Sequence, residues 1–417
     1  MNKIRRRASL EAYRLAGQAA LPLMRARYAQ RVRDGFEKAD QVQQHFGFPS
    51  QEREAGCWIW FHAGSADEVR SLLPLVRLCL AQDLRVIATS SSRYGLALWE
   101  AEERNQTALI SQHAPADVER CVSRFLDHWK PDLAITVADE VLPVTTHCLA
   151  QRRVSCVVVG GVLSQRANDF WAVRPALSAQ TFRQLELGAA TDDAQAELFR
   201  DLGAPQVEVC GDLAFDAPIE SRNSISERAF WAKSGLQVGR KTWLATPTNF
   251  EELTLCVETQ RALSMAGSEI VCLLSPPPSM RASTVEAAVA NAGLSVAQPP
   301  DESSAEVDSD AKNADQAWAS SADVLLLPFG QAGAHAAARS DAIYLGGAFG
   351  GKQSGGLSPV PAIHHRLAIA SGEAVQRHVG FFSRLHKQGA VRIIDSSDDL
   401  AAFLTIVLGD ELAHRRM

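Results

Sequence analysis

The chain has 417 residues, of which 46% are hydrophobic and 22% are charged, and its formal net charge is −6. This length predicts two domains, each large enough for its own hydrophobic core, in an ordinary globular protein. The acidic balance argues against a dedicated nucleic-acid-binding protein, which is usually basic. No run of residues approaches the ~20 apolar positions that a membrane-spanning helix needs. We also expect no signal peptide, because Arg14 and Gln18 break the apolar part of the N-terminus.

The first segment, residues 1–46, is basic, because its Lys and Arg residues outnumber its acidic ones. Apolar residues recur in it near helical spacing, which predicts a basic amphipathic segment interrupted at Pro22. Such a segment either lies on an anionic membrane face or packs on the domain with a solvated basic face.

Beyond residue 46, short apolar runs alternate with amphipathic ones. Short β-rich runs alternating with amphipathic helices predict a parallel, doubly wound sheet. We expect this first domain to span residues 47–220, with a polar link at 217–226. Its expected strands lie at 57–61, 84–89, 132–137, 154–159 and 207–210, and its expected helices at 68–81, 93–103, 115–129, 141–151 and 192–202.

A second alternating block begins at Lys241 and predicts a second doubly wound domain over residues 227–410. Residues 298–316 are acidic and poor in apolar groups, which predicts a disordered surface insertion. A short apolar helix is expected at 400–408, where it could pack across the domains. The expected strands lie at 242–246, 270–274, 324–328, 342–345, 367–369 and 391–394.

Together these patterns predict an α/β protein of two doubly wound, Rossmann-like domains that face a cleft. This arrangement describes a two-lobed glycosyltransferase of the GT-B type. It equally describes periplasmic binding proteins and some epimerases, because a fold alone does not choose a function.

The eight cysteines include no Cys-x-x-Cys pair, and most of them lie in apolar runs. This pattern predicts reduced, buried thiols in a cytoplasmic protein, rather than a disulfide framework or a zinc site. His364 and His365 are adjacent, so on a helix their side chains diverge and they make a poor metal pair. We therefore predict neither a metal nor a cofactor.

Two acidic residues stand where the first expected strand ends and a helix begins. After the apolar run 57–61 and the small residues 63–66, Asp67 and Glu68 open the helix. Ligands bind at this edge of open parallel sheets, and the helix dipole stabilises an ionised carboxylate in a first turn. Glu68 is therefore a candidate general base. The competing interpretation is a helix cap without chemistry.

A second acidic pair, Asp139 and Glu140, lies between strand 132–137 and the next helix. Two acidic strand ends in one sheet favour a focused site, with Glu140 as a second catalytic candidate. Helix capping is again the competing interpretation.

For the glycosyltransferase interpretation, polar residues near these strand ends complete the side of the site that we expect to bind the sugar acceptor, namely Ser65, Ser164 and Arg166. Ser164 and Arg166 follow a pair of glycines after strand 154–159, where a hydroxyl can donate a hydrogen bond and a guanidinium supplies fixed charge. A simple turn is the competing interpretation.

Glycine-rich stretches follow two expected strands of the second domain, at 329–333 and 346–358. The backbone N–H groups of such loops can approach a phosphate. Their spacing fits neither a Walker motif nor a dinucleotide fingerprint. For the glycosyltransferase interpretation, the residues that we expect to bind the sugar donor are Arg281, Gly330, Gln331, Gly355, Gly356 and Ser358.

The segment His62-Ala-Gly-Ser-Ala-Asp-Glu68-Val resembles the His-Ala-x-Ser-x-Gly-Glu-Val segment of the Kdo transferases. These bacterial enzymes move 3-deoxy-D-manno-octulosonic acid (Kdo) from CMP-Kdo onto lipid A. The general base of that family is the Glu of this segment, which falls on Glu68. The resemblance runs through about residues 57–216, including Glu140-Val-Leu-Pro143, which resembles Glu-Leu-Trp-Pro, and Leu163-Ser164-Gln-Arg166, which resembles the end of Asn-Ala-Arg-Leu-Ser-x-Arg.

Several positions of the family pattern differ in this chain. Ala138 stands where the family has the first Glu of Glu-Thr-Glu, and Ala214 stands where it has a Lys that is thought to stabilise charge. The segments that bind CMP in the family align with residues 276–278, 330–332 and 355–361, which lack its Arg, His, Asn and both Glu. Each lost charged hydrogen bond costs ~1.5–3 kcal/mol, so several losses weaken CMP-sugar binding by orders of magnitude.

The resemblance implies a Kdo-transferase-like glycosyltransferase of the lipopolysaccharide pathway, with Glu68 deprotonating an acceptor hydroxyl. The expected partners are a CMP-sugar donor, a lipid A-type acceptor and, peripherally, an anionic membrane, with no nucleic acid. The expected location is the cytoplasmic face of the bacterial inner membrane, or the cytoplasm. Two alternatives stay open: a divergent paralogue with an altered donor, and a non-catalytic binding or regulatory protein that kept the fold.

Overall fold

The computed structural model describes residues 9–34, 37–217, 225–236, 240–277, 280–299, 322–327, 331–349, 356–375 and 379–409. The chain forms two compact units, residues 1–218 and 219–417, and each is described by itself. Residues 300–316 of the expected acidic insertion lie outside the described residues.

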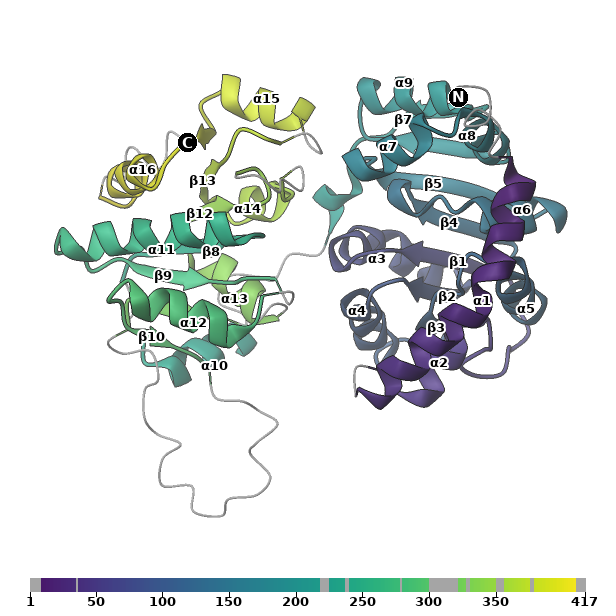
Figure 1. Ribbon diagram of the computed structural model, residues 1–417, viewed down its shortest axis with the longest axis horizontal. Helices are drawn as coiled ribbons and strands as arrows, with labels where there is room; N and C mark the ends of the chain where they lie inside the picture. Colours follow the sequence, from purple (N-terminus) through teal and green to yellow (C-terminus); the bar gives the residue numbers. More distant parts are fainter. Residues whose placement is uncertain are drawn as a thin grey trace, which may run out of the picture. The chain divides into compact units, whose positions relative to one another are not determined.

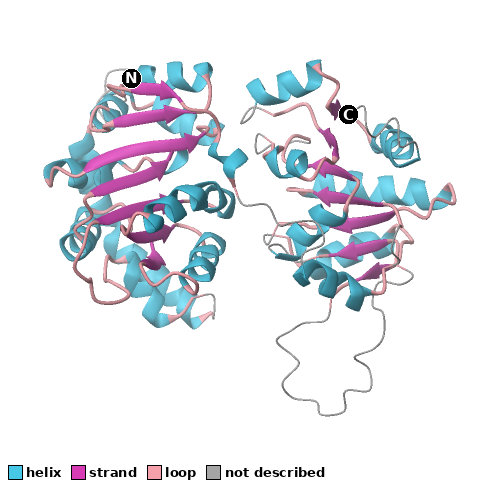
Figure 2. Ribbon diagram, turned by 180° about the vertical axis from the view of Figure 1, so that it is seen from behind, coloured by secondary structure: helices cyan, strands magenta, loops and turns pink. Residues whose placement is uncertain are grey.

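Unit 1 is one seven-stranded parallel sheet with helices on its faces (Figures 1 and 2). Its strands are β1 (Trp58–Ala63), β2 (Arg85–Ser90), β3 (Leu109–His113), β4 (Leu133–Val137), β5 (Ser155–Gly161), β6 (Leu187–Ala190) and β7 (Val207–Val209). Its helices are α1 (Leu10–Arg33), α2 (Ala39–His45), α3 (Ala66–Ala81), α4 (Arg93–Glu103), α5 (Glu119–Trp129), α6 (Pro143–Gln151), α7 (Gln165–Ala172), α8 (Pro175–Phe182) and α9 (Asp193–Leu202). Single turns of 3-10 helix occur at η2 (Ala138–Glu140) and η3 (Leu213–Asp216).

The order of the strands in this sheet is β3-β2-β1-β4-β5-β6-β7. The chain runs outward from β1 to β3 and then crosses over to β4, so the order reverses between β1 and β4. In doubly wound sheets, ligands bind outside the carboxyl ends of the strands at this point. β1 pairs with β4 from Ile59, opposite Leu133, to His62, opposite Thr136. The segments that follow these two strands therefore start side by side at the carboxyl edge.

Aromatic side chains fill the face of this sheet that α5 covers. Trp58, Trp60, Phe125 and Trp129 are all buried. The ring centroids of Trp60 and Phe125 lie 4.7 Å apart, and those of Trp58 and Trp129 lie 5.3 Å apart. The indole N–H of Trp129 donates to Gln112 Oε1 at 3.0 Å. This core fixes β1, which leads directly into the candidate site.

The helix α1 runs without a break through Pro22, so the expected interruption there is wrong. Proline removes one N–H from the helical ladder, but Pro22 lies on the exposed side, where the carbonyl that it leaves without a partner can bond to water. The packing of α1 on α5, α6 and α8, with Leu21 buried, holds the helix together. No helix among the described residues is both long and apolar enough to span a membrane.

Unit 2 repeats the architecture, with a seven-stranded parallel sheet in the order β10-β11-β9-β8-β12-β13-β14 (Figure 1). The order of these strands reverses between β8 and β12. The strands are β8 (Thr242–Thr246), β9 (Val271–Leu274), β10 (Val296–Ala297), β11 (Val324–Leu326), β12 (Ala342–Leu345), β13 (Ala368–Ser371) and β14 (Val391–Ile393). The helices are α10 (Ile225–Ser234), α11 (Phe250–Met265), α12 (Ala282–Asn291), α13 (Gln331–Arg339), α14 (Val360–His364), α15 (Val379–Lys387) and α16 (Ser397–Gly409).

The expected class of fold, two doubly wound Rossmann-like domains, is confirmed, and the cleft between them stays a prediction. Each expected strand is present, but β3, β6 and β10 were not expected. β6 has the sequence Leu-Gly-Ala-Ala, which lacks β-branched and aromatic residues, so its pairing with β5 and β7 decides its structure. The apolar helix expected at 400–408 is the longer α16, which packs chiefly on α11 of its own unit.

The eight cysteines are free thiols; five of them are buried as expected, Cys79 is partly exposed, and two are exposed. Cys57 and Cys210 are exposed, because Cys57 precedes the first residue of β1 and Cys210 follows the edge strand β7. Neither position is covered by the helices that bury the cysteines within the sheet.

We expect Trp129→Phe to destabilise the protein more than Trp99→Phe, by about 1 kcal/mol. Both indoles have 0% exposure in unit 1, so the two substitutions remove similar buried area. Trp129 donates a hydrogen bond, whereas the buried Trp99 N–H has no hydrogen-bond partner among the described residues. Denaturant unfolding followed by circular dichroism measures the difference. Equal losses would show that the Trp129–Gln112 bond contributes nothing to stability.

Candidate active site

The turn between β1 and α3 is a complete capping box. Ser65 is the N-cap residue, and its hydroxyl oxygen accepts the N–H of Glu68 at 3.3 Å. In return, Glu68 Oε2 accepts the N–H groups of Gly64 and Ser65 at 2.8 and 2.9 Å. The sequence favours this geometry because a serine at the N-cap and a glutamate three residues later satisfy N–H groups that the helix leaves unpaired. Glu68 is thus a cap, and its role in chemistry depends on its surroundings.

The surroundings of Glu68 oppose its ionisation. Burial first, and then the charge of Glu140, raise the pKa of the Glu68 carboxyl above its ordinary value. The N–H groups of Gly64 and Ser65 act in the opposite direction but do not reverse the shift. A carboxyl with a raised pKa is the stronger base once it is ionised.

Glu140 lies in η2, directly after β4, and has the opposite environment. Its Oε2 accepts from His62 Nε2 at 3.0 Å and from the Ser91 hydroxyl at 3.1 Å. Burial alone would raise the pKa of Glu140, but the hydrogen bond and charge of His62, with the Ser91 hydroxyl, hold it below its ordinary value. Two neighbouring carboxyls whose environments move their pKa values apart are a recurring arrangement for acid–base roles.

A chain of hydrogen bonds fixes the ring of His62. The Trp60 N–H can only donate, and it donates to Thr89 Oγ1 at 2.8 Å. The Thr89 hydroxyl lies 2.9 Å from His62 Nδ1 and 3.4 Å from Phe61 O. An ionised carboxylate only accepts hydrogen bonds, so Glu140 favours the ring form with its proton on Nε2, and Nδ1 then accepts from Thr89. In either charge state of the ring, His62 therefore donates to Glu140 and keeps it an acceptor.

Gly64 lies between the carboxylates of Glu68 and Glu140. Its N–H donates to Glu68, and a Cβ at this position would lie 2.0 Å from Glu140 Oε1. Only a glycine leaves room for the Glu140 carboxylate against this part of the backbone. The two acidic strand ends that the sequence indicates are thus brought together at the point where the strand order reverses.

The acceptor-side residues of unit 1 lie around this pair to different degrees. Asp139 Oδ1 accepts the N–H of Ser164 at 2.7 Å, which links the segment after β5 to η2. Ser164 also caps α7, where Arg166 is exposed in the first turn. Ser65 is exposed beside Glu68. These residues surround the carboxyl edge, and their contact with an acceptor stays a prediction.

The expected donor residues that the structure describes follow strands of unit 2. Arg281 is the exposed N-cap residue of α12, in the connection after β9. Gly356, with φ of +85°, and Ser358 lie after β12, and Gln331 begins α13 after β11. Gly330 and Gly355 lie outside the described residues. Because the sheet is parallel, these connections share its carboxyl edge.

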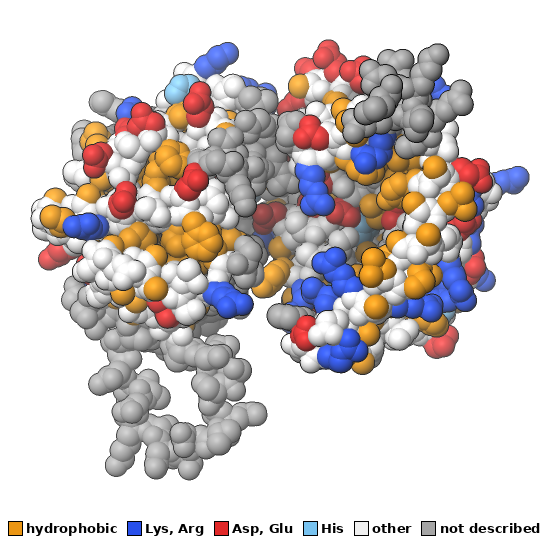
Figure 3. Space-filling view, in the orientation of Figure 1, with side chains coloured by type: hydrophobic (Ala, Val, Ile, Leu, Met, Phe, Trp, Pro, Cys, Tyr) orange, Lys and Arg blue, Asp and Glu red, His pale blue; other side chains and the backbone are white. Residues whose placement is uncertain are grey.

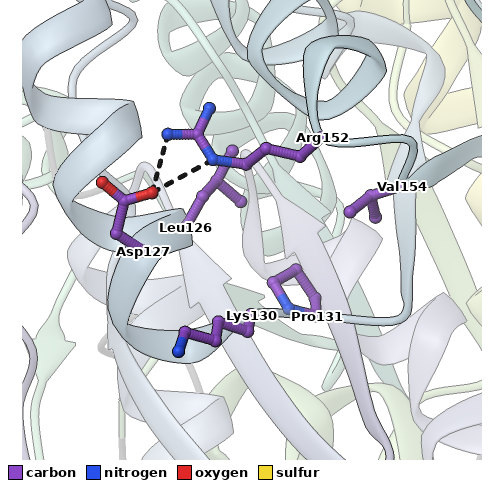
Figure 4. Close-up of a pocket in the computed structure, with 6 residues that line it drawn as sticks. All are labelled: Leu126, Asp127, Lys130, Pro131, Arg152 and Val154. Atoms are coloured by element: carbon purple, nitrogen blue, oxygen red, sulfur yellow. Dashed lines mark hydrogen bonds and ion pairs between the residues drawn. The ribbon is translucent and has the colours of Figure 1, made fainter.

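A pocket of about 570 Å³ lies elsewhere in unit 1 (Figure 4). Its walls come from the end of α5, from residues just before β4 and from the end of α6, so it opens at the amino edge of the sheet. Arg152 crosses it and donates to Asp127 at 2.8 Å. It is therefore separate from the carboxylate pair. The lining residues are Leu126, Asp127, Lys130, Pro131, Arg152 and Val154.

Three polar residues of the carboxylate network were not expected as site residues. His62 and Thr89 lie on β1 and β2, and Ser91 follows β2. The signal that could have found Ser91 is its place at a strand end next to the strand that leads to Glu68. Among the described residues, no group of three His, Cys, Asp or Glu residues is placed to hold a metal ion.

Solved structures show the same architecture. UDP-GlcNAc 2-epimerase from Methanocaldococcus jannaschii has a TM-score of 0.55 at 12% identity, covering 85% of this chain and 93% of that one. The UDP-GlcNAc 2-epimerase from Neisseria meningitidis bound to UDP-GlcNAc has a TM-score of 0.54 at 12% identity, covering 86% and 94%. Identities this low show the fold alone, which is the GT-B type of paired Rossmann-like domains.

Sequence comparison finds relatives of the first domain. The family described as 3-deoxy-D-manno-octulosonic-acid transferase (kdotransferase) matches residues 40–217. A probable mitochondrial 3-deoxy-D-manno-octulosonic acid transferase from Arabidopsis thaliana is 31% identical over 134 residues, 31% of this chain and 29% of the relative. The transferase from Haemophilus influenzae is 26% identical over 226 residues, 52% of this chain and 51% of the relative. The matches span about half or less of these curated relatives. The resemblance to the Kdo transferases is confirmed over residues 40–217, the part of the chain that the family description matches.

We expect His62→Leu to raise the titration midpoint of Glu140, because it removes the N–H that favours the carboxylate. The titration midpoint of Glu68 should fall, because Glu140 then carries less negative charge over the pH range in which Glu68 titrates. NMR of isotope-labelled glutamate carboxyls measures both midpoints. A lowered carboxyl pKa stabilises the fold above the ordinary value of ~4.3, and this contribution is lost as the pH falls through the native pKa. The wild type should therefore lose more stability on acidification than His62→Leu.

The matched control is His62→Gln, whose amide N–H can still donate to Glu140. Its Glu140 midpoint should lie between those of the wild type and His62→Leu. Identical Glu140 midpoints in all three proteins would exclude His62 as the cause of the lowered pKa.

Proposed function

We propose that this protein is a glycosyltransferase of the Kdo transferase kind, which moves Kdo from CMP-Kdo to a lipid A-type acceptor in lipopolysaccharide biosynthesis. The observation that carries the proposal is the pair Glu68 and Glu140, placed on either side of Gly64 where the strand order reverses. The family of the N-terminal domain supports the substrate class.

Each carboxylate has a distinct task in this proposal. Glu68 accepts the proton of the acceptor hydroxyl as its oxygen bonds to the anomeric carbon of the sugar. The bond from that carbon to the phosphate breaks at the same centre, and CMP leaves with the electron pair. Glu140 stays ionised through His62 and Ser91, so it opposes the charge of Glu68 and strengthens the base.

The donor is proposed to bind in unit 2, at the carboxyl edge that Arg281, Gly356 and Ser358 share. The charged residues with which the family binds CMP are absent from the aligned positions 276–278, 330–332 and 355–361. This specific departure favours a second candidate, a paralogue that uses an altered donor through the same base.

Titration of the full chain with CMP, CMP-Kdo and other nucleotides, followed by calorimetry, separates the candidates. Binding of CMP-Kdo supports the first proposal, and binding of a different nucleotide supports the altered donor. An absence of heat with every nucleotide would favour a non-catalytic protein that kept the fold.

We expect Glu68→Gln to lower the rate of sugar transfer by ~10²–10⁴-fold, the typical contribution of a general base. The amide oxygen of Gln can still accept from Gly64 and Ser65, so the cap is kept while the base is lost. Because the pKa of Glu68 is raised, the native state favours the uncharged side chain, and this preference is lost as the pH rises through the native pKa. The variant should therefore be at least as stable as the wild type at neutral pH.

The control is Asp67→Asn, which neutralises the exposed neighbouring carboxylate that pairs with Arg70 at 2.8 Å. It should transfer sugar at the wild-type rate. Glu68→Gln with an unchanged rate in the same assay would remove Glu68 from the mechanism.

We further propose that α1 attaches the protein peripherally to an anionic membrane at the cytoplasmic face of the inner membrane. The outer side of α1 exposes Leu15 at 66% and Leu23 at 74%. Arg25, Arg27 and Arg33 are exposed on the same helix. Figure 3 shows the apolar side chains of this region flanked by basic ones. This combination suits the interface of an anionic bilayer.

Replacing Leu15 and Leu23 together by Ser should weaken binding to vesicles that contain phosphatidylglycerol. Flotation measures the bound fraction, and vesicles of phosphatidylcholine alone should bind little of either protein. Leu78→Ser, at a leucine of α3 that is 59% exposed, is the control and should bind like the wild type. If the double variant floats as well as the wild type, α1 is not the attachment site.

A further inference from the structure

Glu252, in the first turn of α11, is fully buried, with an exposure of 0%. Burying a carboxylate is costly unless hydrogen bonds replace its water. On one side, Oε2 accepts the N–H and the hydroxyl of Thr248 at 2.7 and 3.0 Å. Glu252 thus completes the start of its own helix.

The other oxygen of Glu252 reaches the loop that follows β12. Oε1 accepts three consecutive backbone N–H groups, those of Gly347, Ala348 and Phe349, at 2.7, 3.1 and 3.1 Å. The Tyr344 hydroxyl donates to the same oxygen at 3.2 Å. Backbone N–H groups only donate, so this surrounding fits a carboxylate that accepts on both oxygens.

Consecutive N–H groups that converge on one point form an anion-binding nest. This nest lies where the strand order of unit 2 reverses, between β8 and β12, the place where doubly wound sheets receive ligands. The resident anion is a side chain of the chain itself. These three N–H groups are therefore already bonded and do not serve a donor phosphate.

The nest is connected to a residue expected to bind the donor. Gly356 donates its N–H to Gly347 O at 2.9 Å, and Leu357 donates to Gly346 O at 3.0 Å. The N–H of Gly347 thus donates to Glu252, and the carbonyl oxygen of Gly347 accepts the N–H of Gly356. The position of Gly356 thus follows from that of the Glu252 carboxylate.

The loop has little freedom to take another position. A Cβ on Gly346 would lie 2.2 Å from Thr246 O and 2.8 Å from Glu252 Oε2. Asn249, the N-cap residue of α11, donates its side-chain N–H to Phe349 O at 3.1 Å. The end of β8 and the start of α11 therefore enclose the segment 346–349.

We propose that Glu252 is a positioning residue for the sugar-nucleotide donor: it fills the anion nest after β12 and thereby sets Gly356 for the donor. The nest is a property of unit 2 itself, whereas the role toward the donor rests on the proposed function. Two measurements test these parts separately.

The first measurement is thermal unfolding of the full chain with acetate as the probe. Glu252→Ala empties the nest, so its Tm should fall below that of the wild type. Tens of millimolar sodium acetate should raise the Tm of this variant more than sodium chloride does at the same ionic strength. The control is Glu251→Ala, at the exposed carboxylate one residue earlier, which should show no such preference. Equal changes of Tm in the two variants on addition of acetate would contradict the proposal that these N–H groups form an anion-binding nest.

The second measurement is calorimetric binding of CMP. Glu252→Ala should raise the Kd for CMP by about tenfold or more, and acetate should lower it again. Glu252→Gln fills the space with an amide that cannot satisfy all the donors, so its Kd should rise without rescue by acetate. A Kd that is unchanged in Glu252→Ala would overturn the positioning role.

The outcomes also separate this proposal from the proposed function. A wild type that binds no CMP overturns the donor assignment, and with it the positioning role, while the acetate experiment still decides the nest. If Glu252→Ala does not fold in chloride, its refolded yield in acetate against chloride replaces the Tm. An equal refolded yield in acetate and in chloride contradicts the proposal of an anion-binding nest.

Discussion

The hydrogen bond between His62 Nε2 and Glu140 Oε2, at 3.0 Å, is the contact on which the candidate site depends. It keeps one carboxylate ionised in a half-buried place, and that fixed charge makes ionisation of Glu68 harder. The ring is in turn oriented by Thr89, which accepts from Trp60 in the core. The hydrogen bonds of the candidate site thus depend on the packing of the sheet, because a shift of β1 against β2 would break the chain of bonds.

Both units place a glutamate at the start of a helix, at the point where the strand order of the sheet reverses. In each unit, the helix after the first strand carries a glutamate three residues beyond its N-cap, Glu68 in α3 and Glu252 in α11. The Glu68 carboxylate accepts hydrogen bonds from the backbone of its own turn and stays partly exposed to solvent. Glu252 extends to the neighbouring loop and is closed off completely. The same placement of a carboxylate therefore caps its own helix in the first unit and also binds a neighbouring loop in the second.

The sequence predicts the class of fold because alternating β-rich and amphipathic runs are strong local signals. It also indicates that Glu68 and Glu140 share an edge, since the carboxyl ends of parallel strands meet there. The bonds of Glu140 to His62 and Ser91 could not be predicted, because they depend on the register of three strands. The continuity of α1 through Pro22 and the pairing of β6 are decided by tertiary contacts that override local preference.

The two exposed cysteines offer an experimental handle on unit 1. Cys57 lies at the amino edge of its sheet, before β1, and Cys210 lies at the carboxyl edge, after β7. Both cysteines of unit 2, Cys256 and Cys272, are buried. A thiol-reactive dye should therefore label the first unit and spare the second without any engineering. Substituting Cys57 would leave Cys210, after the last residue of β7, as the one fully exposed cysteine, so that a single fluorophore could be placed at the carboxyl edge of the sheet.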